Sequence, residues 1–201
     1  MPLLRCTDDD CGYQFAVTSR LSIGQSCEEC GADTVEVGVD DDLPAELVEP
    51  PADTRAHPAH ARERARQVAR EHGFHRPPVI VHSIARQLGF TVQASHGLGT
   101  LRARLVGQHI EVNADEPPVA QRFSVAHELG HHLLGTQHGD GETAEQEADA
   151  FAGELLVPGP MLRHALESTT DARELRQLFK VSREVLEIAA RHHRLSDRIT
   201  S

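Results

Sequence analysis

The sequence predicts an α+β protein, in which a mostly helical domain with a small antiparallel sheet follows a small β module. Three observations support this prediction. Apolar residues recur at helical spacing in several segments after residue 57, three short strand-like segments lie between residues 90 and 113, and all four cysteines fall within the first 30 residues. We therefore expect a β module at 1–38, a linker at 39–56 and the larger domain at 57–201.

The cysteines of the β module have nearly the spacing of a four-cysteine zinc ribbon. Fifteen residues separate two close pairs, which are Cys6 with Cys11 and Cys27 with Cys30. Four thiolates close the coordination of a zinc ion and leave no position for water, so the predicted role of this zinc is structural. Residues 13–23 alternate in polarity like a strand, and 34–39 are expected to pair with them. Two disulfides are the alternative, which a reducing cytosol disfavours.

The charge of the chain is concentrated near its start. Residues 1–50 hold 12 acidic and 2 basic side chains, and the net charge of the whole chain is −11. Because phosphate binding needs Lys and Arg, this composition weighs against a ribbon that grips DNA. It favours either docking to a partner or a solubilising cap. Residues 39–56 contain Asp40-Asp41-Asp42 and several prolines, which is typical of an extended acidic linker.

Neither a signal peptide nor a membrane span is visible in the sequence. The first residues lack the apolar run of a secretion signal, and no stretch approaches the roughly 18 apolar residues of a transmembrane helix. We therefore expect a cytoplasmic protein with no membrane contact.

Two helices and three strands are expected in the first part of the larger domain. The helices should cover 57–73 and 77–88, where a Pro-Pro pair opens the second and Gly89 stops it. The strands should follow at 90–94, 101–105 and 109–113. We expect 109–113 to be the edge strand, to which an extended peptide could add.

The next predicted helix, 119–134, carries an HExxH motif. It follows Pro117-Pro118, and the motif is His127-Glu128-Leu129-Gly130-His131. Two histidines four residues apart project from one helix face and can bind one Zn²⁺, and Glu128 can act as general base toward a zinc-activated water. A His-rich helix with a solvated polar face is the alternative.

A second amphipathic helix, 142–156, offers further acidic side chains. A hydrolytic zinc site needs a third protein ligand and one open position. Glu145 suits the ligand role, and Asp149, one turn later, suits an acceptor for the free N–H of a ligating histidine. Glu142 and Glu147 are rivals in the same helix, and a solvated acidic face is the alternative for all four.

Two linked blocks resemble the ImmA/IrrE family of metallopeptidases. They are Arg122–Leu134, RFSVAHELGHHLL, and Glu145–Pro158, EQEADAFAGELLVP. The resemblance implies a gluzincin-like zinc peptidase in which His127, His131 and Glu145 hold the catalytic zinc and Glu128 is the general base. It also implies, by analogy, a substrate of the helix-turn-helix repressor class, since members of the family cleave repressors of mobile elements or stress-response genes.

A peptidase of this kind needs a donor that stabilises the developing oxyanion. The sequence leaves four candidates open, which are His132, His138, His109 and Arg122.

Three short helices are expected at the end of the chain, at about 160–167, 171–179 and 183–193. Asp171 and Glu174 resemble a capping box at the start of the second. Residues 175–186 also resemble a repressor helix-turn-helix. Residues 161–201 hold only 8 basic against 6 acidic side chains, so packing against the larger domain is favoured over DNA binding.

Two function classes follow from the sequence. The first is a zinc endopeptidase that removes a transcriptional repressor, with one catalytic and one structural zinc. The second is a non-catalytic zinc-containing module that regulates a partner by docking. The need for the Glu128 carboxylate distinguishes the two classes. An endopeptidase requires it as general base, whereas a binding module would tolerate its loss. A third possibility is a DNA-binding regulator that uses the C-terminal helices.

Overall fold

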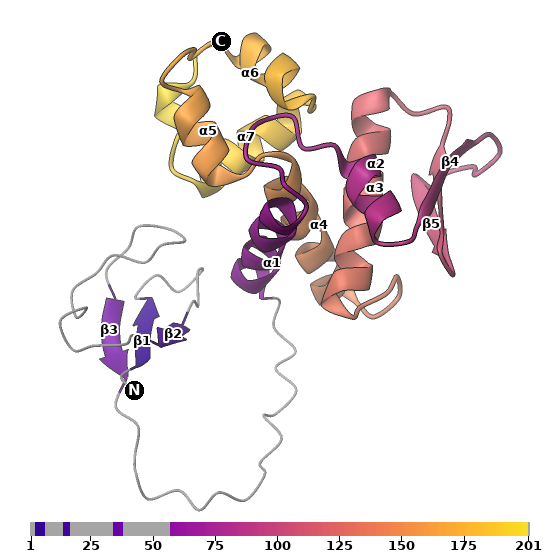
Figure 1. The fold of residues 1–201 in the computed structure, drawn as a ribbon, viewed down its shortest axis with the longest axis horizontal. Helices are drawn as coiled ribbons and strands as arrows, with labels where there is room; N and C mark the ends of the chain where they lie inside the picture. The colour runs from indigo at the N-terminus through magenta and orange to yellow at the C-terminus, as the bar shows by residue number, and fades with distance from the viewer. Residues whose placement is uncertain (1–2, 7–13, 17–33, 38–56, 201) are drawn as a thin grey trace, which may run out of the picture.

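The computed structural model of the chain describes residues 3–6, 14–16, 34–37 and 57–200. The predicted α+β class is confirmed: helices form most of the larger domain, with a small sheet on one side and the C-terminal helices grouped on the other (Figure 1). None of the helices in these residues combines the length and apolar character that a membrane span requires.

Three short strands near the start of the chain form an antiparallel sheet. They are β1 (Leu3–Cys6), β2 (Gln14–Ala16) and β3 (Thr34–Val37), and their order is β2-β1-β3. The strands at 14–16 and 34–37 therefore both pair with β1, and the expectation that they pair with each other was wrong. Cys11, Cys27 and Cys30 lie outside the described residues, as does the whole of the linker at 39–56. The zinc ribbon and the domain boundaries stay predictions.

Three long helices form the centre of the larger domain. Helix α4 (Glu142–Leu156) packs against both α1 (Pro58–Glu71) and α3 (Pro118–Leu134). A Cβ added at Gly130 of α3 would lie 3.2 Å from the backbone of Ala148, so the absence of a side chain lets the two helices approach closely. This contact fixes the faces that α3 and α4 turn toward each other.

Helix α2 (Val81–Gln87) begins later than the sequence predicted. The expected start was the Pro77-Pro78 pair, but the helix begins three residues after it. The ring of a proline disfavours the helical conformation in the residue before it, so Pro77 cannot readily open a helix that contains Pro78. Val81 and Ile84 are fully buried where α2 packs on α3.

The second sheet lies beside α3 and is mixed rather than wholly antiparallel. Its strands are β4 (Thr91–Ser95), β5 (Ala103–Val106) and β6 (His109–Asn113), in the order β4-β6-β5. β4 pairs with β6 in parallel and β5 pairs with β6 antiparallel. The expectation that 109–113 is an edge strand was therefore wrong, because β6 lies in the middle and buries Ile110 and Val112. The edges are β4 and β5.

The C-terminal helices include a helix–turn–helix pair. After α5 (Gly159–Ala165), helix α6 (Ala172–Phe179) and helix α7 (Arg183–His192) are joined by a tight turn. The predicted start of α6 is confirmed, since the Asp171 carboxylate accepts a hydrogen bond from the Glu174 N–H at 2.9 Å. A short 3₁₀ helix, Ser196–Arg198, follows.

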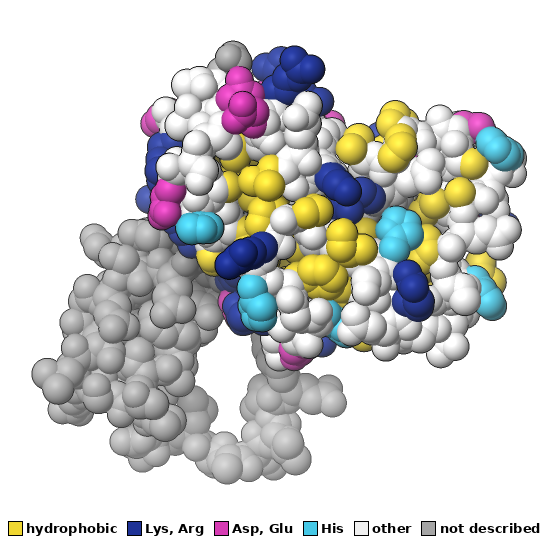
Figure 2. Space-filling model, turned by 45° about the horizontal axis from the view of Figure 1, so that its top comes forward, with side chains coloured by type: hydrophobic (Ala, Val, Ile, Leu, Met, Phe, Trp, Pro, Cys, Tyr) yellow, Lys and Arg dark blue, Asp and Glu magenta, His cyan; other side chains and the backbone are white. Residues whose placement is uncertain are grey.

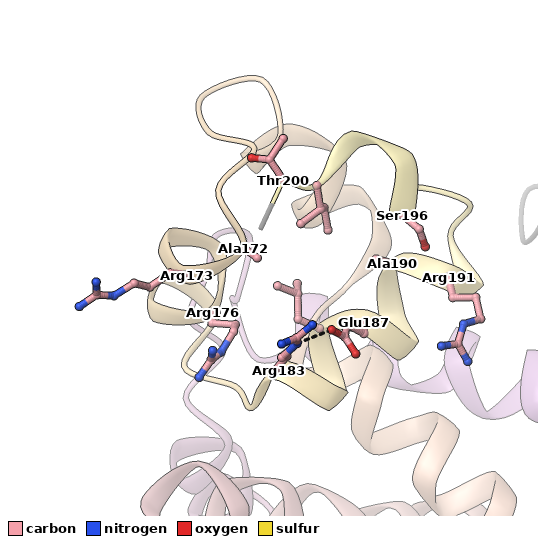
Figure 3. A pocket seen from close by; sticks show the side chains of 11 residues that line it. Ala172, Arg173, Arg176, Arg183, Glu187, Ala190, Arg191, Ser196 and Thr200 are labelled. Carbon is pink, nitrogen blue, oxygen red and sulfur yellow. Dashed lines mark hydrogen bonds and ion pairs between the residues drawn. The ribbon is translucent and has the colours of Figure 1, made fainter.

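The surface around these helices is hollowed but carries none of the predicted site residues. A cavity of about 500 Å³ between α6, α7 and residues 196–200 has Leu186 and Ile199 among its apolar lining. Arginines surround it, but Arg173 points away from it and Arg183 pairs with Glu187 (Figure 3). On the face shown in Figure 2, hydrophobic side chains gather beside Lys, Arg and His.

A buried ionic network joins α4 to α1 and α7. Glu154 is 3% exposed, and its Oε2 accepts a hydrogen bond from His193 Nε2 at 2.8 Å. Its Oε1 accepts from Arg66 at 3.2 Å and from the Gly159 N–H at 3.0 Å. Burial raises the pKa of Glu154, but the bond to His193 and the charges of His193 and Arg66 outweigh it, and the net shift is downward. The charged carboxylate is therefore fully paired inside the protein.

His192, next to this network, is expected to make the fold sensitive to acid. Burial, followed by the charges of Arg62 and His193, lowers its pKa to about 4, and its Nε2 is buried without a hydrogen-bond partner among the described residues. Between about pH 6.5 and pH 4 the unfolded chain therefore binds a proton that the folded chain excludes. The free energy of unfolding should fall as the pH falls through this window.

Denaturant unfolding at pH 7 and pH 5 measures this effect. His192→Asn should show a smaller loss of stability than the wild type between the two pH values, because Asn cannot take up the proton. His164→Asn, on the exposed side of α5, should lose as much as the wild type. Equal losses in all three proteins would contradict the assignment.

Candidate metal centre

The HExxH histidines lie together on the face of α3 that meets α4. His127 and His131 are one helical turn apart, and their Nε2 atoms are 3.1 Å from each other. His131 is buried, and burial, together with the nearby His127 and His138, lowers its pKa. Its imidazole is therefore held in the neutral form, which is the form that binds a metal ion.

Helix α4 places Glu145 opposite the two histidines. Glu145 Oε2 lies 3.3 Å from His127 Nε2, and Oε1 lies 3.5 Å from His131 Nε2. Burial raises the pKa of Glu145, but the hydrogen bond and charge of His138 and the charges of the other two histidines outweigh it, so the pKa is lowered. The carboxylate is therefore charged and faces two ring nitrogens.

The rival carboxylates of α4 do not reach this cluster. Glu142 accepts a hydrogen bond from Gln146 on the helix surface. Glu147 accepts one from the His57 N–H at 2.8 Å. Among the acidic residues of α4, the structure brings only Glu145 and Asp149 to the histidines.

Each histidine is oriented through its second nitrogen. His127 Nδ1 lies 2.9 Å from Asp149 Oδ1. His131 Nδ1 lies 3.0 Å from Thr136 Oγ1. Thr136 was not among the residues expected from the sequence, because it stands in the turn after α3 and belongs to no motif. Both rings are thus held with Nε2 toward the centre of the cluster.

Asp149 gives a direct test of this arrangement. Asp149→Ala should weaken zinc affinity by at least about tenfold, because loss of a residue that orients a ligating histidine typically has an effect of that size. Competition with a chromophoric chelator measures the affinity. Glu142→Ala, on the same helix but away from the cluster, should leave it unchanged, and an equal effect in both variants would argue against the orienting role.

Glu128 lies beside the histidines and is buried. Its exposure is 2%, and its Oε1 is 3.0 Å from His138 Nε2. Its Oε2 is buried without a hydrogen-bond partner among the described residues. A buried carboxylate oxygen with no donor is costly unless another group reaches it, so this atom indicates a ligand or water in the cleft.

The donors present fit a zinc ion. Two imidazole nitrogens and a carboxylate converge on one point. A hydrogen bond between the two Nε2 atoms would leave the carboxylate out, whereas one metal ion would contact all three groups. Imidazole nitrogen with carboxylate oxygen is a ligand set typical of hydrolytic zinc.

Of the four candidates for an oxyanion donor, the structure brings His138 into the cluster. His109 bonds Thr91 within the sheet, and His132 packs edge-on against Phe90. Arg122 donates to backbone carbonyls of Val79, Lys180 and Phe179 and is structural. Burial lowers the pKa of His138, but its hydrogen bonds to Glu128 and Glu145 outweigh this and raise it.

The cluster opens into a cleft that is bounded by β5. The cleft has a volume of about 560 Å³, and its lining includes Glu128, Phe123 and the segment 100–104. Because β5 is an edge of the sheet, it has unpaired backbone groups near the cluster that an extended peptide could bind. The edge strand beside the site is thus β5 and not the predicted 109–113.

Known proteins resemble this chain in sequence family and in fold. The family model Peptidase_M78, described as the IrrE N-terminal-like domain, matches residues 85–191, which is more than half of the chain. A solved structure titled a Mycobacterium tuberculosis transcriptional regulator is similar at 20% sequence identity and a TM-score of 0.50. The similarity covers 63% of this chain and 45% of that one, so this chain spans less than half of that structure's length. No curated protein matches the chain.

Proposed function

The chain belongs to the family of the IrrE N-terminal-like domain, a peptidase family, and from this premise we propose that it is a zinc-dependent endopeptidase. In this proposal His127, His131 and Glu145 hold the catalytic zinc. The observation that carries it is the convergence of these three side chains beside a buried carboxylate, Glu128, which has one oxygen without a partner among the described residues.

Each residue of the cluster has one task in the proposed reaction. His127, His131 and Glu145 would hold a zinc ion, which would supply Lewis acidity toward a water molecule and the scissile carbonyl. Glu128 accepts the proton from the water and passes it to the nitrogen of the leaving amine. Asp149 and Thr136 hold the two histidine rings in place. The backbone of β5 aligns the peptide as an added strand across the cleft.

The substrate that we propose is a helix-turn-helix transcriptional repressor, whose removal would derepress stress-response or mobile-element genes. Support for it comes from the family, and the cleft adds a physical constraint. An edge strand binds extended chain, so the scissile bond should lie in a loop or linker of the repressor rather than within a folded helix.

The proposal is tested by mapping cleavage products. An extract of the source organism is treated with the wild-type protein or with Glu128→Gln, and new N-termini are labelled and identified by mass spectrometry. We expect few new termini, located in a linker of a helix-turn-helix repressor and absent with Glu128→Gln. The same set of termini with both proteins would refute a peptidase. Capture of the same partner by both proteins without cleavage would support the docking module instead.

A further inference from the structure

His138 lies against every member of the proposed zinc site. It stands in the loop 135–141 between α3 and α4. Its ring is stacked on that of His127, with centroids 5.4 Å apart and planes inclined by 17°. It meets the ring of His131 at 4.4 Å and 63°.

Both ring nitrogens of His138 contact groups that the proposed reaction needs. Nδ1 is 2.9 Å from Glu145 Oε1, and Nε2 is 3.0 Å from Glu128 Oε1. One donor atom each from His127, His131, Glu145 and His138 lie within 4.8 Å of one another. The cluster therefore contains four side chains that can reach one metal ion.

The number of protein ligands decides whether a zinc site is open. Three protein ligands leave a position for water or substrate, whereas four complete a tetrahedral shell. We propose that His138 is a displaceable fourth ligand of the metal, which closes the site at rest and leaves when a substrate enters. This inference rests on the proposed function, because it assigns a further residue to the same metal ion.

The position of His138 in the chain suits displacement. Its side chain is 47% exposed, whereas those of His127 and His131 are 13% and 3% exposed. The loop begins at Gly135 and ends at Gly141, whose φ angles of 72° and 107° strain other residues. The two helical histidines are fixed by the packing of α3, but His138 can move with a short surface loop.

The resting arrangement also engages one oxygen of the base. While His138 is in place, Glu128 Oε1 is held in a hydrogen bond, and among the carboxylate oxygens only Oε2 is left to accept a proton from water. Departure of His138 would free this oxygen and the fourth metal position together. A single loop movement would thus convert a closed site into one that is competent for hydrolysis.

The test measures metal affinity and access to the metal in the full chain. For wild type, His138→Ala and the surface control His164→Ala, zinc affinity is measured by chelator competition. The same proteins loaded with Co²⁺ are titrated with azide and followed by visible absorption, with His131→Ala as the baseline. We expect His138→Ala to bind zinc at least about tenfold more weakly than the wild type and His164→Ala do. Its Co²⁺ absorption should also change at a lower azide concentration than theirs. A second variant, His138→Asn, should behave like His138→Ala.

Two other results would overturn the inference. If both His138 variants keep wild-type zinc affinity and azide response but lose peptidase activity, His138 is an oxyanion donor and not a ligand. If the wild type binds azide as readily as the variants, the resting site is already open. A failure of the proposed function looks different: His131→Ala would then retain as much metal as the wild type.

Discussion

Glu128→Gln is expected to lower the peptidase rate at least about a hundredfold and to leave the metal bound. The amide keeps the shape of the side chain but cannot take a proton from water, and loss of general-base catalysis typically costs a factor of 10² to 10⁴. Because Glu128 is not among the proposed ligands, its replacement removes no donor atom from the metal. Cleavage kinetics on the identified substrate and zinc content per chain measure the two effects.

Glu147→Gln is the matched comparison for this variant. It changes a carboxylate of α4 that bonds the His57 N–H and lies away from the cleft lining. It should cleave at the wild-type rate. Undiminished cleavage by Glu128→Gln would exclude Glu128 as the base, and a loss of zinc from that variant would make its rate uninformative about the base.

Glu154→Ala is expected to destabilise the fold by about 3–5 kcal/mol, which is the usual cost of removing one partner from a buried ion pair. The change leaves Arg66, His193 and the Gly159 N–H without their common acceptor. Glu154→Gln should cost less, because the amide oxygen can still accept from Arg66 and Gly159 while its NH₂ donates to the His193 ring. Denaturant unfolding at neutral pH measures both.

The effect of Glu154 should also depend on pH. Its pKa is lower in the folded than in the unfolded state, so its contribution is present above about pH 4.5 and is lost as the pH falls through the folded pKa. Glu167→Ala removes an exposed carboxylate of a surface pair and should cost no more than about 1 kcal/mol. If Glu154→Ala unfolds as readily as Glu167→Ala, the network contributes no net stability.

The elements that could be read from the sequence are those with a strong local signal. Helices α3 and α4 lie within a residue of their predicted bounds, because their apolar residues recur at helical spacing and prolines mark their ends. The HExxH spacing alone brings His127 and His131 together, since it is set by the pitch of one helix. Placing Glu145 against them needed a second helix, and that helix offered two rivals for the ligand role, Glu142 and Glu147.

The features that could not be read depend on tertiary contacts. Sheet order is one, because β6 has an ordinary strand pattern and nothing local reveals that β4 and β5 flank it. Thr136 and His138 stand in an irregular turn, where neither periodicity nor motif marks a residue, and the sequence offered His138 only as one of four oxyanion-donor candidates. Glu154 looks like one more acid of an amphipathic helix until α1 and α7 enclose it. Each of these features depends on contacts with residues that are distant along the chain.

Zinc content per chain, compared between the wild type and His131→Ala, tests the central claim most directly. The full-length wild type should hold about two zinc ions, one at the four cysteines and one at His127, His131 and Glu145. His131→Ala should hold about one and remain folded by circular dichroism. An equal zinc content in the two proteins would show that the HExxH histidines hold no metal, and the peptidase would have to be abandoned for a binding module.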